Sequence, residues 1–163
     1  MTAKSAVSST FKSSCPADTA RLARLLARRL AGGEVIFLEG PIGSGKTFFV
    51  RGLAAALGAK KLPVSASFNL MRSYCGRLKL YHFDLFRAGA ADLENIGLDE
   101  YLFRCDGITA VEWPGEAVRI FSGLEPLRLE FRLAGGDRRE IIARAAGASE
   151  KLLRGLKEKW LKK

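Results

Sequence analysis

The stretch GPIGSGKTFF, residues 40–49, constrains the fold more than any other part of the sequence. It matches the pattern G-x-x-x-x-G-K-[ST] at Gly40, Gly45, Lys46 and Thr47. The apolar run VIFL precedes it and a run typical of a helix follows, which is the context that this pattern requires. Backbone N–H groups wrap a phosphate chain in such a loop, and glycine leaves their approach open. The stretch therefore predicts a cradle for the polyphosphate of a nucleoside triphosphate.

All eight loop residues are expected to take part in nucleotide binding, and two of them carry side-chain chemistry. Lys46 can reach the terminal phosphates as a point charge, and the Thr47 hydroxyl can ligate magnesium. The helix that starts near Lys46 directs the positive end of its dipole toward the phosphates. The predicted binding set is Gly40, Pro41, Ile42, Gly43, Ser44, Gly45, Lys46 and Thr47.

Two carboxylates follow apolar strands elsewhere in the chain. Asp84 closes the run LYHFD, and Glu112 closes the run ITAVE. Ligands of open α/β sheets bind just beyond the carboxyl ends of the strands, so either side chain could meet a metal ion there. An acid at a strand end can also serve only the turn that follows. Together with the loop, the two acids favour a magnesium site formed by Thr47 and Glu112 and a catalytic set of Lys46, Asp84 and Glu112.

Two further segments carry polar groups near the predicted site. Ser65 and Ser67, in the segment VSASF, occupy the place where phosphate-sensing switch segments often lie. His82 is the single histidine of the chain and lies inside the run LYHFD. For this residue a hydrogen-bonded strand histidine is favoured over a catalytic base.

Helical and strand patterns alternate along the chain. Helices are predicted for PADTARLARLLARRLAGG, for KTFFVRGLAAALGA and for residues 90–103. Strands are predicted for EVIFLEG, FNLMRSY, LKLYHFD and GITAVEW, and a hairpin for LRLEFRL with REIIARA. This order predicts the α/β class, a three-layer sandwich like that of P-loop NTPases. Its central sheet is expected to be mixed and mainly parallel, with extra antiparallel hairpin strands.

The length of 163 residues is that of one ordinary domain. The serine-rich start, MTAKSAVSSTFKSS, predicts a flexible tail over residues 1–14. Residues 15–163 are then expected to form a single domain that ends in a basic helix, SEKLLRGLKEKWLKK.

The charge of the chain is strongly positive and uneven. Of the net charge of +10, six charges lie beyond residue 127, where eleven Lys or Arg face five Asp or Glu. Such a surface attracts nucleic acid or an acidic protein, although a solvated basic helix face is an equally good interpretation.

Composition also bears on the compartment. No apolar stretch approaches the roughly 18 residues that a membrane span needs, so no membrane contact is expected. The three cysteines form no C-x-x-C pair and leave an odd count, which favours neither a disulfide framework nor a zinc site. A reducing cytoplasm is the expected location.

The sequence resembles the TsaE (YjeE) family, small bacterial P-loop ATPases that serve in making the threonylcarbamoyladenosine modification of tRNA. The resemblance covers residues 15–114 and rests on four motifs in order: GPIGSGKTFFVRGLAAALG, VSASFNLMRSY, LYHFDLFR with IGLDEYL, and VEWP. It implies a magnesium-binding glutamate at Glu112, a strand-end aspartate at Asp84 and a motif tryptophan at Trp113. This tryptophan would pack on the nucleotide, on a partner or in the core. Adenine contacts are implied for Asp18 or Thr19.

The chain departs from the usual motifs of this family at three places. Ser65-Ala66-Ser67-Phe68 stands where members usually have S-P-T-F, so the hydroxyl of Ser67 is kept and a stiffening proline is lost. Phe48 and Phe86 stand where members commonly have a threonine and a tyrosine. Neither aromatic replaces a phosphate or metal ligand.

The resemblance implies magnesium-dependent binding and hydrolysis of ATP in support of this tRNA modification, together with TsaD and TsaB partner proteins. Lys46 and Mg²⁺ would neutralise the charge that develops on the terminal phosphates while a positioned water attacks. The basic carboxyl-terminal segment would offer a contact for tRNA. Two alternatives remain open: a small-molecule kinase on the same cradle, and a non-catalytic adaptor gated by nucleotide.

Overall fold

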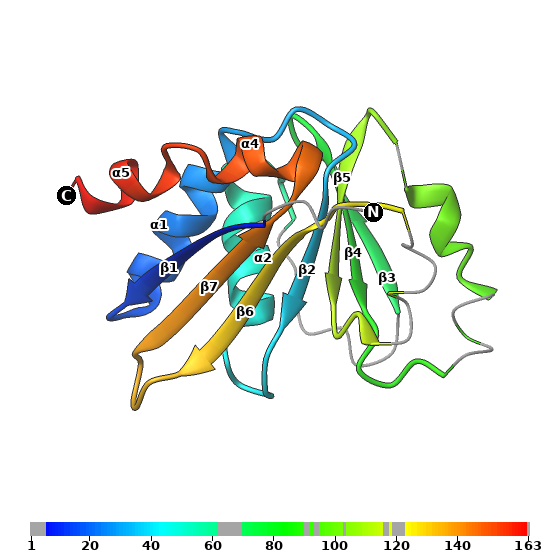
Figure 1. The fold of residues 1–163 in the computed structure, drawn as a ribbon. Helices are drawn as coiled ribbons and strands as arrows, with labels where there is room; N and C mark the ends of the chain where they lie inside the picture. Colours follow the sequence, from blue (N-terminus) through cyan, green and yellow to red (C-terminus); the bar gives the residue numbers. More distant parts are fainter. Residues whose placement is uncertain are drawn as a thin grey trace.

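Seven strands form one mixed sheet: β1 (Val7–Ser13), β2 (Val35–Glu39), β3 (Met71–Tyr74), β4 (Lys79–Asp84), β5 (Gly107–Glu112), β6 (Leu127–Leu133) and β7 (Arg139–Ala145). Their order across the sheet is β1-β7-β6-β2-β5-β4-β3 (Figure 1). The computed structural model describes residues 6–61, 70–89, 92, 95–102, 104–115, 118 and 123–162.

The direction of the strands changes from the centre of the sheet to its edges. The four neighbouring strands β6, β2, β5 and β4 run parallel, whereas β7 and β3 run antiparallel to them, and β1 pairs antiparallel with β7. The predicted mixed sheet with extra antiparallel strands is therefore confirmed. In the parallel centre, β2, β5 and β4 all end at the same edge of the sheet, where Glu112 lies opposite Asp84 in the strand register.

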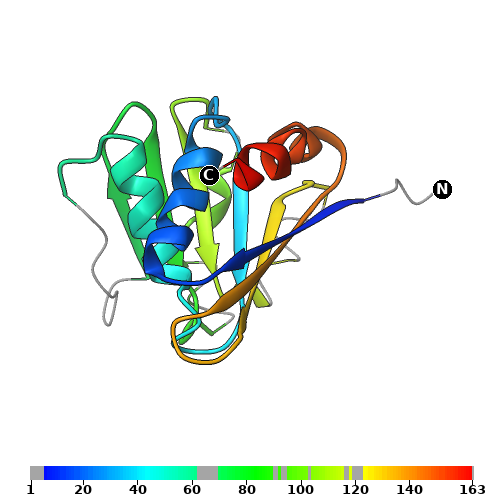
Figure 2. The ribbon, with the colours of Figure 1, turned by 90° about the vertical axis from the view of Figure 1, so that its left-hand side faces the viewer.

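Helices cover one face of this sheet: α1 (Pro16–Ala27), α2 (Lys46–Ala56), α4 (Glu150–Leu153) and α5 (Leu156–Leu161). Figure 2 shows α1 and α2 side by side on one side of the strands. The two helices approach closely at Gly52, where an added Cβ would lie 3.1 Å from the side chain of Ala23. No described helix is long and apolar enough to cross a bilayer.

Hydrophobic side chains fill the space on both faces of the sheet. On the helix-covered face, the buried cluster joins strands β1, β6 and β7 to the helices, with Phe11, Leu22, Phe49, Phe131 and Leu153 among its members. On the opposite face, Phe37, Phe83 and Val111 contact Leu98 and Leu102 of the segment that contains the 3₁₀ helix η1 (Leu98–Tyr101). The second face thus has only a thin covering layer among the described residues, and the predicted helix over residues 90–103 is described only in part.

The prediction of a flexible tail over residues 1–14 is wrong for Val7–Ser13. These residues form the edge strand β1, which pairs with β7 over seven residue pairs from Val7–Ala145 to Ser13–Arg139. The hydrophobicity pattern does not reveal this strand, because only one of its faces is buried and Phe11 is the one large apolar side chain that is buried there. Serine, threonine and lysine fill the solvent-facing positions, so the segment resembles a polar tail in sequence.

The predicted basic carboxyl-terminal helix is not continuous. A 3₁₀ turn, η3 (Gly147–Ser149), leads into α4, and the chain then breaks at Gly155, which has a φ of 64°. The break lets α4 and α5 adopt different directions while Leu152, Leu153 and Leu156 all remain buried. The first helix is also shorter than predicted, because α1 ends at Ala27.

The role of β1 can be tested with one core substitution. Phe11 is fully buried (0% exposed), so Phe11→Ala should lower the free energy of unfolding by about 3–5 kcal/mol in urea denaturation. Thr10→Ala, at the exposed neighbouring position, should change it by less than about 0.5 kcal/mol. A loss below about 1 kcal/mol for Phe11→Ala would mean that the segment is frayed in solution.

Candidate functional site

The glycine-rich loop, Gly40–Thr47, connects β2 to α2 at the carboxyl edge of the parallel strands. Gly40, Gly43 and Gly45 have φ values of 138°, 75° and 102°, which side chains with a Cβ rarely adopt. Gly40 is also restricted by space, because a Cβ there would lie 2.4 Å from the carbonyl oxygen of Phe131 on β6. The path of the backbone therefore requires all three glycines of the loop.

Arg139, at the start of β7, braces the loop from the neighbouring hairpin. Its Nε donates a hydrogen bond to the Ser44 carbonyl at 3.0 Å, and its Nη2 donates to the Gly43 carbonyl at 3.3 Å. Its Nη1 also donates to the Gly136 carbonyl at 2.7 Å, which ties the hairpin turn to the same side chain. No local sequence pattern predicts this contact, because Ser44 and Arg139 lie 95 positions apart.

Lys46, the first residue of α2, holds its charge inside the loop. Its Nζ donates hydrogen bonds to the carbonyls of Gly40 at 2.7 Å and Pro41 at 2.9 Å, and lies 3.9 Å from the ring centre of Trp113. Burial lowers the pKa of the Lys46 ammonium, and the nearby charges of Glu112 and Asp84 act in the opposite direction. The ammonium is thus a cation with little water around it, where its electrostatic interactions are strong.

Glu112 lies at the centre of a buried hydrogen-bond chain. Its Oε2 accepts a hydrogen bond from the Thr47 hydroxyl at 2.9 Å, and its Oε1 lies 2.9 Å from Nε2 of His82. Both Glu112 and His82 are only 2% exposed. The structure therefore brings together Thr47 and Glu112, the two predicted metal ligands, and adds His82, which sequence reasoning had not assigned to the site.

Asp84 ends β4 beside Glu112 and faces the same cavity. Its Oδ1 accepts a hydrogen bond from the backbone N–H of Phe86 at 3.2 Å. Burial is the largest influence on the pKa of the Asp84 carboxyl and raises it, and the negative charge of Glu112 adds to this effect. That hydrogen bond, together with His82 and Lys46, acts in the opposite direction.

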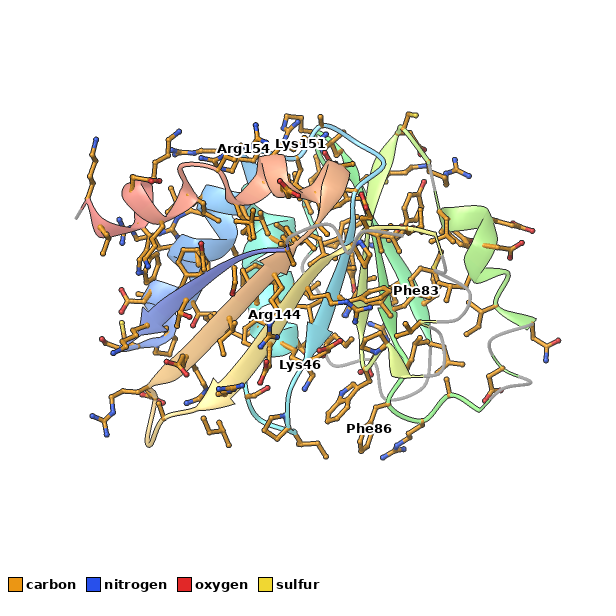
Figure 3. All side chains as sticks on the ribbon, in the orientation of Figure 1. Lys46, Phe83, Phe86, Arg144, Lys151 and Arg154 are labelled. Atoms are coloured by element: carbon orange, nitrogen blue, oxygen red, sulfur yellow. The ribbon has the colours of Figure 1, made fainter. Side chains whose placement is uncertain are left out.

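These groups surround a cavity of about 420 Å³, lined by Ile42, Gly43, Gly45, Lys46, Thr47, Phe48, Asp84, Phe86, Arg87, Glu112 and Trp113. Figure 3 shows Lys46 and Phe86 toward the same edge of the sheet. The interior of the cavity is charged, whereas large exposed apolar side chains stand at its rim, with Ile42 70% exposed. Phe48 and Phe86, two of the three departures from the usual family motifs, both belong to this rim.

Trp113 lines the cavity and has an unusual backbone conformation. It is the one non-glycine residue with a positive φ, 58°, among the residues that the structure describes. Its ring contacts both the Lys46 ammonium and the ring of Phe86, whose centre is 4.9 Å away. Such conformations cost energy and are held in place by their surroundings, which is typical of functional sites.

The remaining predicted contacts lie elsewhere. Asp18 accepts a hydrogen bond from the backbone N–H of Ser14 at 2.8 Å, and the Thr19 hydroxyl lies 2.8 Å from that of Ser13. Neither Asp18 nor Thr19 is among the described residues that line the cavity. Ser65 and Ser67 lie outside the described residues.

A second cavity, of about 480 Å³, has Arg139 in its lining. Ser13 and Ser14, which Thr19 and Asp18 hold in place, belong to its lining. The full lining is Lys12, Ser13, Ser14, Arg132, Leu133, Ala134, Arg138, Arg139 and Glu140. Arg139 therefore lines this cavity and also hydrogen-bonds the glycine-rich loop.

Comparison with known proteins identifies close similarity over most of the chain. The family model described as threonylcarbamoyl adenosine biosynthesis protein TsaE matches residues 13–141. The tRNA threonylcarbamoyladenosine biosynthesis protein TsaE of Bacillus subtilis is 37% identical over 139 residues, 85% of this chain and 86% of that protein. The protein of the same name from Treponema pallidum is 38% identical over 125 residues, 76% of this chain and 91% of that protein.

A solved structure shares the fold. The crystal structure of Bacillus subtilis YdiB superposes with a TM-score of 0.78 at 32% sequence identity. The superposition covers 96% of this chain and 99% of that one, so it includes the antiparallel edge strands as well as the parallel centre.

The raised pKa of Asp84 leads to a prediction about stability. An ionised Asp84 destabilises the folded state, so Asp84→Asn should raise the free energy of unfolding at pH 7 while keeping the acceptor for the Phe86 N–H. The difference should shrink as the pH falls toward 3.8, the ordinary value, because the wild-type carboxyl is then protonated in the folded protein. Urea denaturation of both proteins between pH 7 and pH 4 measures this difference in the free energy of unfolding.

Asp137→Asn, at an exposed position of the β6–β7 turn, serves as the matched control and should change little. A lower stability of Asp84→Asn than of the wild-type protein at pH 7 would contradict the prediction.

Proposed function

The chain belongs to the TsaE family, and from this membership and the site geometry we propose that it binds and hydrolyses ATP with Mg²⁺ to support threonylcarbamoyladenosine modification of tRNA. The observation that carries the proposal is the Thr47–Glu112 hydrogen bond beside the glycine-rich loop. It joins the hydroxyl that such loops offer to magnesium with a strand-end carboxylate, within the same charged cavity.

The nucleotide would lie across the glycine-rich loop. Its phosphates would take the backbone N–H groups from Gly43 to Thr47, with the Lys46 ammonium exchanging its carbonyl partners for phosphate oxygens. Its base and sugar would extend past Arg139 toward the second cavity. Asp18 and Thr19 would then act on the adenine side indirectly, by holding Ser14 and Ser13 in the wall of that cavity.

The donor atoms of the site fit a magnesium ion. Thr47, Glu112 and Asp84 offer hard oxygen ligands, which Mg²⁺ prefers. No cluster of three or more His, Cys, Asp or Glu that could hold a metal by itself occurs among the described residues. Thr47 and Glu112 would therefore hold the ion together with nucleotide phosphates, and the ion would supply charge stabilisation when bound.

The protein groups divide the catalytic work by position. Lys46 would stabilise the charge that develops on the terminal phosphates, in surroundings where burial strengthens the interaction. Asp84, at the mouth of the same cavity, would orient the attacking water by accepting its hydrogen bond. Trp113 would keep the Lys46 side chain on the loop side of the cavity through the cation–π contact.

Membership of the TsaE family also suggests which proteins the chain acts with. We propose that the protein acts with a TsaD–TsaB-like complex in the cytoplasm, where its hydrolysis of ATP would serve that assembly. Measuring phosphate release from ATP with and without the partner complex tests this directly. Phosphate that appears on a small metabolite and not in solution would instead indicate a kinase.

Two substitutions separate binding from hydrolysis. Lys46→Ala should weaken ATP binding at least about tenfold, because it removes the buried charge from the phosphates. Glu112→Gln should lower phosphate release about 100- to 1,000-fold and change affinity much less, because the backbone cradle remains. Calorimetric ATP titration and phosphate release under single-turnover conditions measure the two effects.

Lys60→Ala, at an exposed position beyond the far end of α2, is the charge control and should match the wild-type protein. If Lys46→Ala left both affinity and partner-dependent turnover intact, the proposed function would be wrong. Equal losses of affinity and hydrolysis in Glu112→Gln would assign Glu112 a structural role.

A tRNA contact through the carboxyl-terminal segment is a separate part of the proposal. Lys157, Lys159 and Lys162 are exposed, whereas Leu152, Leu153 and Leu156 of the same segment belong to the core. Charge substitutions therefore test the contact better than truncation. The triple change of these lysines to alanine should flatten the slope of log K against log[salt] for tRNA binding by about 1–2 units. The triple change to arginine, which keeps the charge, is the control. An unchanged slope in the alanine variant would show that these charges serve solvation only.

A further inference from the structure

His82 occupies a position where an unpaired polar ring would be costly. It lies within β4, opposite Ala110 of β5 and Arg72 of β3, and is 2% exposed. A buried polar group needs a hydrogen-bond partner. The partner that the structure provides is Glu112, through an Nε2–Oε1 distance of 2.9 Å.

The two oxygens of Glu112 have different partners on different elements. Oε1 lies against His82 of β4, and Oε2 accepts from Thr47 of α2. A carboxylate held at only one oxygen can rotate about its last bond, whereas one held at both oxygens has a single orientation. Glu112 is only 2% exposed, so its charge depends on these two hydrogen bonds for most of its polar contact.

We propose that His82 is a positioning residue for the magnesium site, an inference that rests on the function proposed above. By donating its Nε2–H to Oε1, His82 turns Oε2 of Glu112 toward the Thr47 hydroxyl. The Thr47 proton is thereby directed at Glu112, and the oxygen lone pairs of Thr47 are left for a ligand in the cavity. Hydrogen bonds of this kind to metal-binding side chains commonly change metal affinity 10- to 100-fold when they are removed.

A purely structural role makes a different prediction. If His82 only satisfies a buried carboxylate, its loss would lower the stability of the fold and leave the dependence of nucleotide binding on Mg²⁺ unchanged. The positioning role acts on that dependence itself. The ratio of ADP affinities in Mg²⁺ and in EDTA is therefore the decisive quantity.

A matched pair of substitutions isolates the hydrogen bond. Glutamine can place an N–H donor near the position of Nε2, whereas methionine has a similar length and shape without a donor. We expect His82→Met to reduce the Mg²⁺-dependent gain in ADP affinity at least about tenfold in calorimetric titrations. His82→Gln should stay within about threefold of the wild-type gain, and both variants should bind ADP in EDTA as the wild-type protein does.

The outcomes of this titration are distinguishable. A full Mg²⁺-dependent gain in His82→Met overturns the positioning role and leaves the proposed function intact. A wild-type protein with equal ADP affinities in Mg²⁺ and EDTA overturns the proposed function, and the positioning role with it. If His82→Met does not fold, His82→Asn replaces it, because asparagine is too short to bring a donor to the Nε2 position.

A spectroscopic test needs no nucleotide at all. Since His82 is the single histidine, ¹H–¹⁵N correlation spectra of the imidazole contain the signals of this ring alone. The proposal requires a protonated Nε2 in the wild-type protein and a shifted Nε2 signal in Glu112→Gln. An unprotonated Nε2 would overturn it, because the ring would then accept a proton from Glu112 and could not hold the carboxylate as described.

Discussion

The carboxylate of Glu112, buried and bonded at both oxygens, is the interaction on which the site depends. Glu112 is the last residue of β5. Its carboxylate accepts a hydrogen bond from the Thr47 hydroxyl of α2 and lies at hydrogen-bond distance from the His82 ring of β4. Three elements that are distant in sequence are thus fixed relative to one another at the carboxyl edge of the sheet. A charge in this place is stable only with complete hydrogen bonding, so the site and the packing around it are formed together.

The antiparallel half of the sheet also contributes to the site. Arg139 of β7 bonds the loop carbonyls, and the Phe131 carbonyl of β6 limits position 40 to glycine. The edge strand β1 pairs with β7 and places Phe11 in the core. The hairpin is therefore a structural support for the glycine-rich loop, and four basic residues, Lys12, Arg132, Arg138 and Arg139, line the second cavity beside it.

Sequence predicted the parts of this molecule that are encoded locally. The glycine spacing specified the loop and its backbone conformations, and the strand-end positions of Asp84 and Glu112 indicated that both acids would share an edge. The partners of Glu112 and of the loop carbonyls were not all predictable. His82 reaches Glu112 across the strand register, and Arg139 reaches the loop across 95 residues, so no local pattern records either contact. The segment of β1 was predicted to be a tail for a different reason: Phe11 is its one buried large apolar residue, which is too weak a pattern to indicate a strand.

The central claim is that Thr47 and Glu112 form one oxygen site next to phosphates held by the loop. A crystal structure of the chain with a non-hydrolysable ATP analogue and Mg²⁺ tests it most directly. The account predicts phosphate oxygens on the loop amides, the Lys46 ammonium on a phosphate, and the ion beside Thr47 with the Glu112–His82 bond retained. A nucleotide bound elsewhere, or Glu112 turned away from Thr47 in the complex, would contradict it.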